Sequence, residues 1–160
     1  MKPTVYLGFS VPSYWLEPAS DDPIIHARHL ITRRWWDEEL RRFDVRISQY
    51  VLDELARGDS HRATRRLELV KQFALQDISD AVIDAAEFYM ANFAMPRRDA
   101  RDAFHLAFAS VYEVDYLLTW NYAHLANASK RKHIETLNQR LRLISPVICS
   151  PEELMLELEE

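Results

Sequence analysis

The chain alternates short, strongly apolar runs with longer amphipathic segments, and this alternation limits the available folds more than any other feature. The apolar runs are rich in β-branched and aromatic residues and are bounded by turn-forming residues, as is typical of buried strands. We predict strands at 4–9, 45–48, 115–120 and 141–149, and either a connection or a weak strand at 74–79. Strands that alternate with helices favour right-handed βαβ crossovers, so we expect an α/β fold with a mostly parallel sheet.

The segments between these strands carry helix signals. Asp22 is placed to cap a helix that has Pro23 in its first turn, and Ser60 and Ser79 are placed to cap two later helices. Ser150 precedes Pro151 and two glutamates, which predicts an acidic terminal helix. We therefore predict helices at 24–43, from the second strand through Glu54 to near Gly58, at 61–73, 80–93 and 96–112, a short and a longer helix within 121–141, and the terminal helix at 151–160.

Length and composition exclude several classes of protein. At 160 residues, we expect a single domain spanning 1–160. The net charge of −5 means that a nucleic-acid partner would have to be held by a local basic patch. Two glycines are too few for a Gly-rich phosphate loop, and one cysteine permits no intramolecular disulfide. The sequence shows neither a signal peptide's apolar core nor a membrane-spanning run, so we expect a cytoplasmic protein without membrane contact.

Polar residues follow the predicted strands at the points where parallel α/β sheets bind ligands. Gly8 and Ser10 follow the first strand, and Glu54 lies in the helix after the second. Asn121 follows the strand at 115–120, and Asp102 lies near the start of the helix that feeds that strand. Ligands in such folds sit outside the carboxyl ends of the strands. Mg²⁺ and Mn²⁺ prefer oxygen ligands and keep several waters, so a few carboxylates at this edge would suffice for a site.

Four ordered segments resemble the PIN-domain family, in its VapC-like toxin branch of metal-dependent ribonucleases. They are VYLGFSVPSY, ISQYVLDELARGD, DAFHLAFASVYEVDYLLTWNYAHLANA and PVICSPEEL, and together they extend over nearly the whole chain. The resemblance implies a three-layer α/β/α PIN-like fold and Mg²⁺- or Mn²⁺-dependent hydrolysis of RNA phosphodiesters. It also implies a homodimer that is neutralised by a cognate antitoxin protein.

The family's acidic site maps onto this chain with one replacement. By resemblance, Glu54 matches the second acid, Asp102 the third, and Asn121 the fourth position, while the first acid has become Gly8 and Ser10 keeps its polar companion. A carboxylate beside a divalent cation supplies several kcal/mol even at an effective dielectric of about 20. We therefore expect weak metal binding and impaired cleavage. The alternative is a catalytically inactive PIN-fold protein that retains RNA or partner binding.

Each assignment has an ordinary alternative. Asp102 and Asn121 would each suit a helix start, and Asp53 competes with Glu54 for the acidic role. His105, one turn beyond Asp102, could join a zinc site with His124, but it could also simply be packed or support a neighbouring metal ligand.

Basic and aromatic clusters suggest partners. Arg98 and Arg101, with Arg97, flank Asp102 and are candidates for RNA-phosphate contacts, as is the run 130–132, although most charge runs are solvated. Asp99 could substitute in part for the missing acid. The adjacent tryptophans at 35–36 are expected in the core, with a partner interface as the alternative. A small-molecule-binding α/β domain is disfavoured by the lack of a nucleotide loop.

Overall fold

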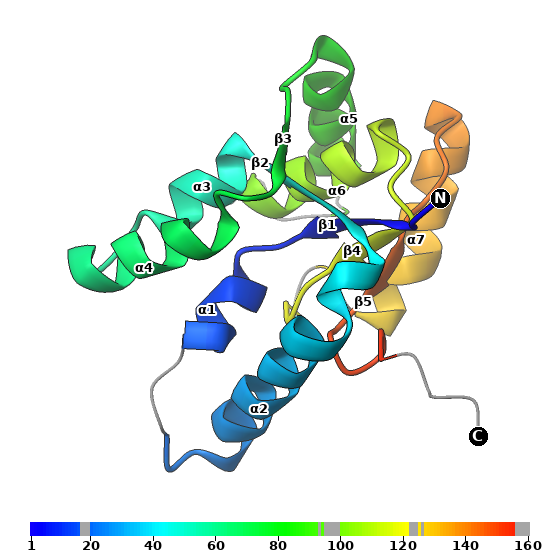
Figure 1. Ribbon diagram of the computed structural model, residues 1–160. Helices are drawn as coiled ribbons and strands as arrows, with labels where there is room; N and C mark the ends of the chain where they lie inside the picture. Colours follow the sequence, from blue (N-terminus) through cyan, green and yellow to red (C-terminus); the bar gives the residue numbers. More distant parts are fainter. Residues whose placement is uncertain (17–19, 93, 95–99, 122–124, 126, 156–160) are drawn as a thin grey trace.

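A computed structural model describes residues 1–16, 20–92, 94, 100–121, 125 and 127–155 (Figure 1). It contains a five-stranded sheet in the order β3-β2-β1-β4-β5, and every neighbouring pair of strands is parallel. The strands are β1 (Thr4–Leu7), β2 (Asp44–Ser48), β3 (Ala74–Gln76), β4 (Tyr116–Leu118) and β5 (Val147–Cys149). The α/β class and the parallel sheet predicted from the sequence are confirmed, and the weak strand at 74–79 is present as the edge strand β3.

The order of the strands creates a switch point beside β1. From β1 the chain builds β2 and β3 on one side, and it then returns to build β4 and β5 on the other side. Val5 of β1 pairs with Val45 of β2 and with Tyr116 of β4, which places β1 at the centre of the sheet. Sheets of this type bind ligands at the carboxyl ends of the strands, where the direction of strand addition reverses. The ends of β1 and β4 are therefore the place to look for a site.

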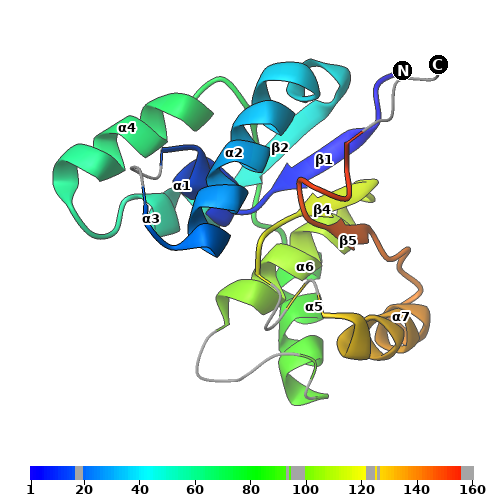
Figure 2. The same cartoon turned by 90° about the horizontal axis from the view of Figure 1, so that it is seen from below.

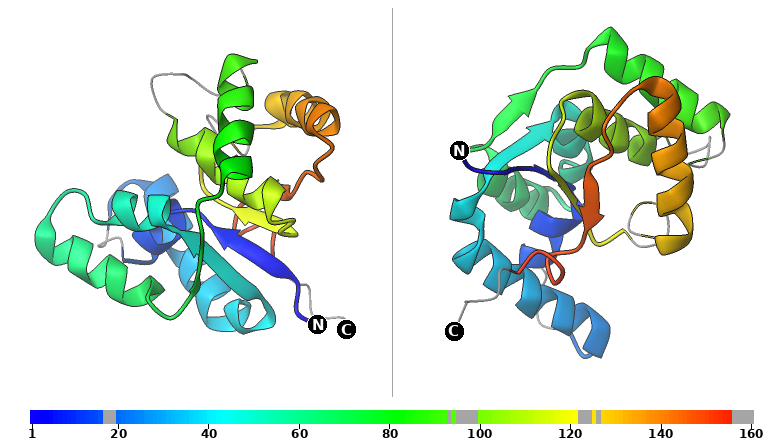
Figure 3. Two further views of the ribbon diagram at one scale, coloured as in Figure 1. Left: turned by 90° about the horizontal axis from the view of Figure 1, so that it is seen from above. Right: turned by 90° about the vertical axis from the view of Figure 1, so that its right-hand side faces the viewer.

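Helices cover both faces of the sheet. Helices α1, α2 and α4 lie on one face, and α5, α6 and α7 lie on the other (Figures 2 and 3). Val5, Tyr6 and Leu7 of β1 are accordingly all fully buried, which gives a continuous apolar strand and not an alternating one. The helices are α1 (Ser10–Leu16), α2 (Pro23–Glu38), α3 (Gln49–Leu55), α4 (Ser60–Val70), α5 (Asp80–Ala91), α6 (Arg101–Val111) and α7 (Ala128–Leu141), with a 3-10 turn at Leu40–Arg42.

Of the three predicted helix caps, Asp22 and Ser79 are confirmed and Ser60 is wrong. Asp59 caps α4 instead, because its carboxylate accepts from the Arg62 N–H at 2.9 Å and Ser60 is already the first helical residue. The Asp22 carboxylate accepts hydrogen bonds from the backbone N–H groups of Ile24 and Ile25, at 2.9 and 3.2 Å, and Pro23 occupies the first turn. Helix α2 is shorter than predicted, because it ends at Glu38 and a 3-10 turn leads into β2. Within the described ranges, no helix is both long and apolar enough to cross a membrane.

Two predictions near the carboxyl terminus are wrong in extent. The strand predicted at 141–149 contains only Val147–Cys149, because α7 continues to Leu141 and Arg142 takes a left-handed conformation (φ 60°) that ends it. Turns, not a helix, occupy the described part of the predicted terminal helix, at 151–154. Pro151 and Leu154 are the buried residues of this segment, and a single turn between them is too short to overcome the cost of helix nucleation. Residues 156–160 lie outside the described residues.

The adjacent tryptophans divide between core and periphery. Trp35 is fully buried and stacks on Phe43, with ring centroids 5.8 Å apart. Trp36 is half-buried and packs edge-on against Phe73 at 5.7 Å. Core packing, the expected role of this pair, accounts for Trp35 in full and for Trp36 in part.

Candidate active site

Asp102 and Asn121 meet at the carboxyl edge of the sheet. Helix α6 runs back along the sheet, so its first turn, which holds Asp102, lies near the residues that follow β4. The Asn121 side-chain amide donates to Oδ1 of Asp102 at 3.0 Å, and Asp102 is only 6 % exposed. The chain therefore joins two of the predicted site residues across a separation of 19 positions.

The capping alternative for Asp102 receives no support from α6. The residue at the cap position of this helix is Ala100, which makes no side-chain capping hydrogen bond. Asp102 lies inside the first turn, where a negative charge is favourable to the helix dipole. The helix that Asn121 would cap falls largely on residues outside the described part.

Glu54 points into the protein, whereas its neighbour Asp53 points to solvent. Glu54 in α3 is 7 % exposed, and its Oε1 is hydrogen-bonded to Nε2 of His105. Asp53 is exposed and accepts a hydrogen bond from the Gln49 amide at 2.9 Å. His105 follows Asp102 by three residues on α6, an axial rise of about 4.5 Å. This geometry favours Glu54 over Asp53 as the second acid, which remains a prediction.

A buried polar chain continues from His105 into the sheet. The Tyr6 hydroxyl lies 2.7 Å from Nδ1 of His105 and 2.6 Å from the Ser48 hydroxyl. Burial raises the pKa of Tyr6, so its phenol keeps its proton. Both ring nitrogens of His105 are thus engaged, which argues against a zinc site at this histidine. His124, the other member of that hypothesis, lies outside the described residues.

Gly8 occupies the expected position of the missing acid, directly after β1. Its N–H donates to the Leu118 carbonyl of β4 at 2.9 Å. A Cβ at this position would lie 3.1 Å from the same carbonyl oxygen and 3.4 Å from Thr119. The backbone of Gly8 is not in the left-handed region, so the conformation itself does not require glycine. A larger residue would need β4 to shift by a few tenths of an ångström.

Ser10 connects the start of α1 to the end of β4. Its hydroxyl oxygen accepts a hydrogen bond from the Trp120 N–H at 2.9 Å and lies 3.3 Å from the Thr119 hydroxyl. The Thr119 hydroxyl in turn accepts from the Asn121 N–H at 3.0 Å. These bonds hold the residues after β1 and β4 together at the switch point. The role predicted for Ser10 in substrate binding remains a prediction.

The basic residues predicted to contact RNA are only partly described. Arg101 is the first residue of α6, beside Asp102, and is half-buried. Arg97, Arg98 and Asp99 lie outside the described residues. In the second basic run, the Lys130 ammonium donates to the Ala94 carbonyl at 3.2 Å.

The groups at this edge have the right chemistry for a hard cation but little charge. Asp102, Glu54 and Asn121 offer carboxylate and amide oxygens, which Mg²⁺ and Mn²⁺ prefer. Among the described residues, however, no three acidic, histidine or cysteine side chains group closely enough to form a metal site. The available oxygens therefore fit such an ion, and the shortage of carboxylates fits the weak binding expected from the loss of the first acid.

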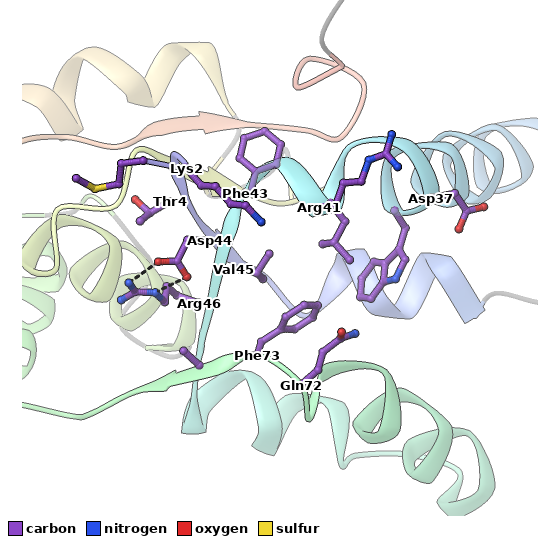
Figure 4. Close-up of a pocket in the computed structure, with 14 residues that line it drawn as sticks. Lys2, Thr4, Asp37, Arg41, Phe43, Asp44, Val45, Arg46, Gln72 and Phe73 are labelled. Atoms are coloured by element: carbon purple, nitrogen blue, oxygen red, sulfur yellow. Dashed lines mark hydrogen bonds and ion pairs between the residues drawn. The ribbon is translucent and has the colours of Figure 1, made fainter.

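A cavity of about 830 Å³ lies at the opposite, amino-terminal edge of the sheet (Figure 4). Phe43 and Phe73 contribute to its walls, and Lys2 and Arg41 bring positive charge. Arg46 also lines it, but is bound to Asp44 through two hydrogen bonds. The cavity contains none of the residues predicted to act in catalysis.

No protein-family model and no curated protein sequence matches this chain. Solved structures match it in three dimensions. VapC20 of Mycobacterium tuberculosis, a toxin that cleaves the sarcin–ricin loop, superposes with a TM-score of 0.58 at 16 % identity, over 76 % of this chain and 92 % of that one. This chain has the PIN-like fold of the VapC toxins.

Two further structures support the same fold. VapBC2 of Rickettsia felis, bound to a DNA fragment from its promoter, gives a TM-score of 0.59 at 13 % identity over 92 % of this chain and 98 % of that one. FitAcB of Neisseria gonorrhoeae gives 0.58 at 15 % identity over 94 % and 100 %. The PIN-like α/β fold implied by the sequence resemblance is thus confirmed, while identities this low carry no site residue across.

Proposed function

We propose that this protein is a VapC-like toxin homologue, a Mg²⁺- or Mn²⁺-dependent endoribonuclease that hydrolyses RNA phosphodiesters. The observation that carries the proposal is the meeting of Asp102 and Asn121 at the switch point of a PIN-like sheet, with the inward-facing Glu54 held against the same helix. An RNA-cleaving toxin with the same fold supports the substrate class.

Three side chains would hold the ion. The Asp102 carboxylate is oriented by the Asn121 amide, and Glu54, held through Oε1 by His105, has its second oxygen to offer. When bound, a divalent ion supplies positive charge that lowers the pKa of a coordinated water and neutralises charge on the scissile phosphate. Asn121 keeps the Asp102 carboxylate in one orientation, and Arg101, the residue before Asp102 on α6, would pair with an RNA phosphate.

Among the described residues, neither Cys149 nor Ser10 is suited to act as a covalent nucleophile. Cys149 is buried, and burial raises the pKa of its thiol to about 12, so it does not form a thiolate at neutral pH. The Ser10 hydroxyl is hydrogen-bonded to the Trp120 N–H. Hydrolysis by water therefore accounts best for the groups present.

Gly8 would limit this activity. Without the first acid, two carboxylates remain to balance a divalent charge, and each missing carboxylate removes several kcal/mol of attraction at an effective dielectric of about 20. The cation would be held weakly, and cleavage would need millimolar rather than micromolar metal.

The second candidate is a catalytically inactive PIN-fold protein that retains RNA or partner binding. Two observations favour it: Gly8 brings no charge, and one oxygen of Glu54 is already bound to His105. Under either proposal the partners would be RNA and a cognate antitoxin protein, and the protein would act as a homodimer.

Cleavage of end-labelled single-stranded RNA separates the two candidates. We expect products that appear with millimolar Mn²⁺, disappear with a chelator, and fall at least about 100-fold in rate in Asp102→Ala, since that change removes a direct metal ligand. Asp115→Ala is the matched control, because it removes an acid at the opposite, amino-terminal end of β4. Equal rates for the wild type and Asp102→Ala would establish the inactive alternative.

A further inference from the structure

A chain of four buried polar side chains lies beneath the candidate site. Ser48 of β2, Tyr6 of β1, His105 of α6 and Glu54 of α3 are hydrogen-bonded in that order, so the chain joins four elements. Ser48 and Tyr6 are fully buried, and the side chains of His105 and Glu54 are each 3 % exposed. A polar cluster this deep is costly unless each member has a partner, and here each member has one.

The direction of the hydrogen bonds follows from the chemistry of the two ends. A carboxylate only accepts, so Nε2 of His105 carries a hydrogen and donates to Glu54. In the neutral ring Nδ1 then accepts from the Tyr6 hydroxyl, whose oxygen accepts in turn from the Ser48 hydroxyl. All donors therefore point along the chain toward Glu54, and no proton is left without an acceptor.

This arrangement holds one carboxylate oxygen of Glu54 and leaves the other available. Oε1 is bound to His105, while Oε2 makes no hydrogen bond to any residue in the described part of the chain. Helix α6, which carries His105, also carries Asp102 one turn earlier, on the side that faces the end of β4. A carboxylate fixed in this way needs no reorientation to meet a cation between α3 and the start of α6.

We propose that His105 and Tyr6 are positioning residues that hold Glu54 ready as a ligand for a divalent cation, an inference that rests on the proposed function. Tyr6 acts indirectly, because its hydroxyl orients the His105 ring and the ring orients the Glu54 carboxylate. Groups that orient a metal ligand typically change metal affinity by about 10 to 100-fold when removed.

Tyr6→Phe tests the proposal against a matched variant, Tyr89→Phe. Tyr89 is also fully buried, and its hydroxyl donates to Asn138, so each change deletes one buried phenol hydroxyl together with its hydrogen bonds. The measurement is the Kd of Mn²⁺ by calorimetry without RNA, together with thermal unfolding of the metal-free protein. We expect similar losses of stability, but a Kd raised about 10-fold by Tyr6→Phe and changed less than twofold by Tyr89→Phe.

Two variants of His105 keep the test decisive if Tyr6→Phe does not fold. The amide of His105→Gln can still donate to Glu54 and should keep the Kd within about threefold of the wild type, whereas His105→Leu cannot and should raise it at least 10-fold. Equal Mn²⁺ affinities in these two variants, or in the two tyrosine variants, would overturn the positioning role.

Glu54→Gln distinguishes failure of this inference from failure of the proposed function. If Glu54→Gln weakens Mn²⁺ binding while Tyr6→Phe behaves like Tyr89→Phe, the metal site stands and the positioning role is wrong. If the wild type binds no Mn²⁺, or Glu54→Gln binds it as the wild type does, Glu54 is not a ligand and both proposals fall.

Discussion

The two ends of the sheet hold charge in different ways. At the amino-terminal end, the Asp44–Arg46 pair borders a wide cavity, and its side chains are 43 and 30 % exposed (Figure 4). At the carboxyl end, Glu54 and Asp102 are almost entirely buried, and each is held by a polar partner from another element. An exposed pair is worth little because water replaces a lost partner, whereas a buried carboxylate depends on its partner.

This contrast indicates where function should be sought. The wide cavity lies where the charges are solvated and paired with each other, so its volume alone does not mark a site. Buried acidic groups held in place at a switch point are unusual in a stable core, and such groups concentrate at functional sites. The carboxyl end is therefore the better candidate although its groups are nearly covered.

Removing one partner at each end should give the largest difference. His105→Leu leaves Glu54 buried without its donor and should lower the free energy of unfolding by about 3 kcal/mol. Arg46→Leu leaves Asp44 in contact with water and should cost about 0.5 kcal/mol. Urea denaturation of both variants measures the two values. Comparable losses would mean that the two ends do not differ as described.

A smaller effect is expected from two adjacent acids on α3. Glu54→Gln should weaken Mn²⁺ binding at least about 10-fold, because it removes an inward-facing ligand charge. Asp53→Asn removes the same charge from a solvent-exposed position and should leave the Kd within twofold. Calorimetry on both proteins checks the prediction, and a larger change in Asp53→Asn would reassign the second acid.

The smallest effect concerns pH at the amino-terminal end. The hydrogen bond from Arg46 holds the pKa of Asp44 below its usual value. Because the folded-state pKa is the lower one, the resulting stability is present above the unfolded pKa and is lost as pH falls through the folded one. Asp44→Asn should therefore cost about 0.5 kcal/mol at pH 7 and progressively less as the pH falls toward about 2. Urea midpoints at both pH values measure it, and a difference that persists at pH 2 would contradict the assignment to this ion pair.

The sequence was sufficient to predict the strands and their alternation with helices, because a sheet covered on both faces requires continuous apolar strands such as β1 and β4, but α1 was not among the predicted helices. It failed at the carboxyl terminus, where the cap at Ser150 is present but the described chain after it supports only a turn. A local capping residue indicates where a helix can start, but it does not show whether the residues that follow make enough tertiary contacts to stabilise the helix.

The contacts between site residues were predictable only where the order of strands and helices alone brings two residues together. A helix that precedes a parallel strand starts near the carboxyl end of that strand, and this brought Asp102 of α6 to Asn121 after β4. The hydrogen bonds of the Tyr6 hydroxyl were not predictable, because a tyrosine within an apolar strand is expected simply to pack in the core. Its hydroxyl partners, Ser48 and His105, lie 42 and 99 positions away along the chain. Only the packing of α6 on the sheet brings these groups together.

The central claim is that the carboxyl end is a cation site short of one charge at position 8. Titration of Mn²⁺ into Gly8→Asp and Gly8→Asn tests it most directly, because the two side chains have nearly the same shape and share the close approach of Cβ to the Leu118 carbonyl. We predict that Gly8→Asp binds Mn²⁺ at least about 10-fold more tightly than Gly8→Asn. Equal affinities in the two variants would contradict the account.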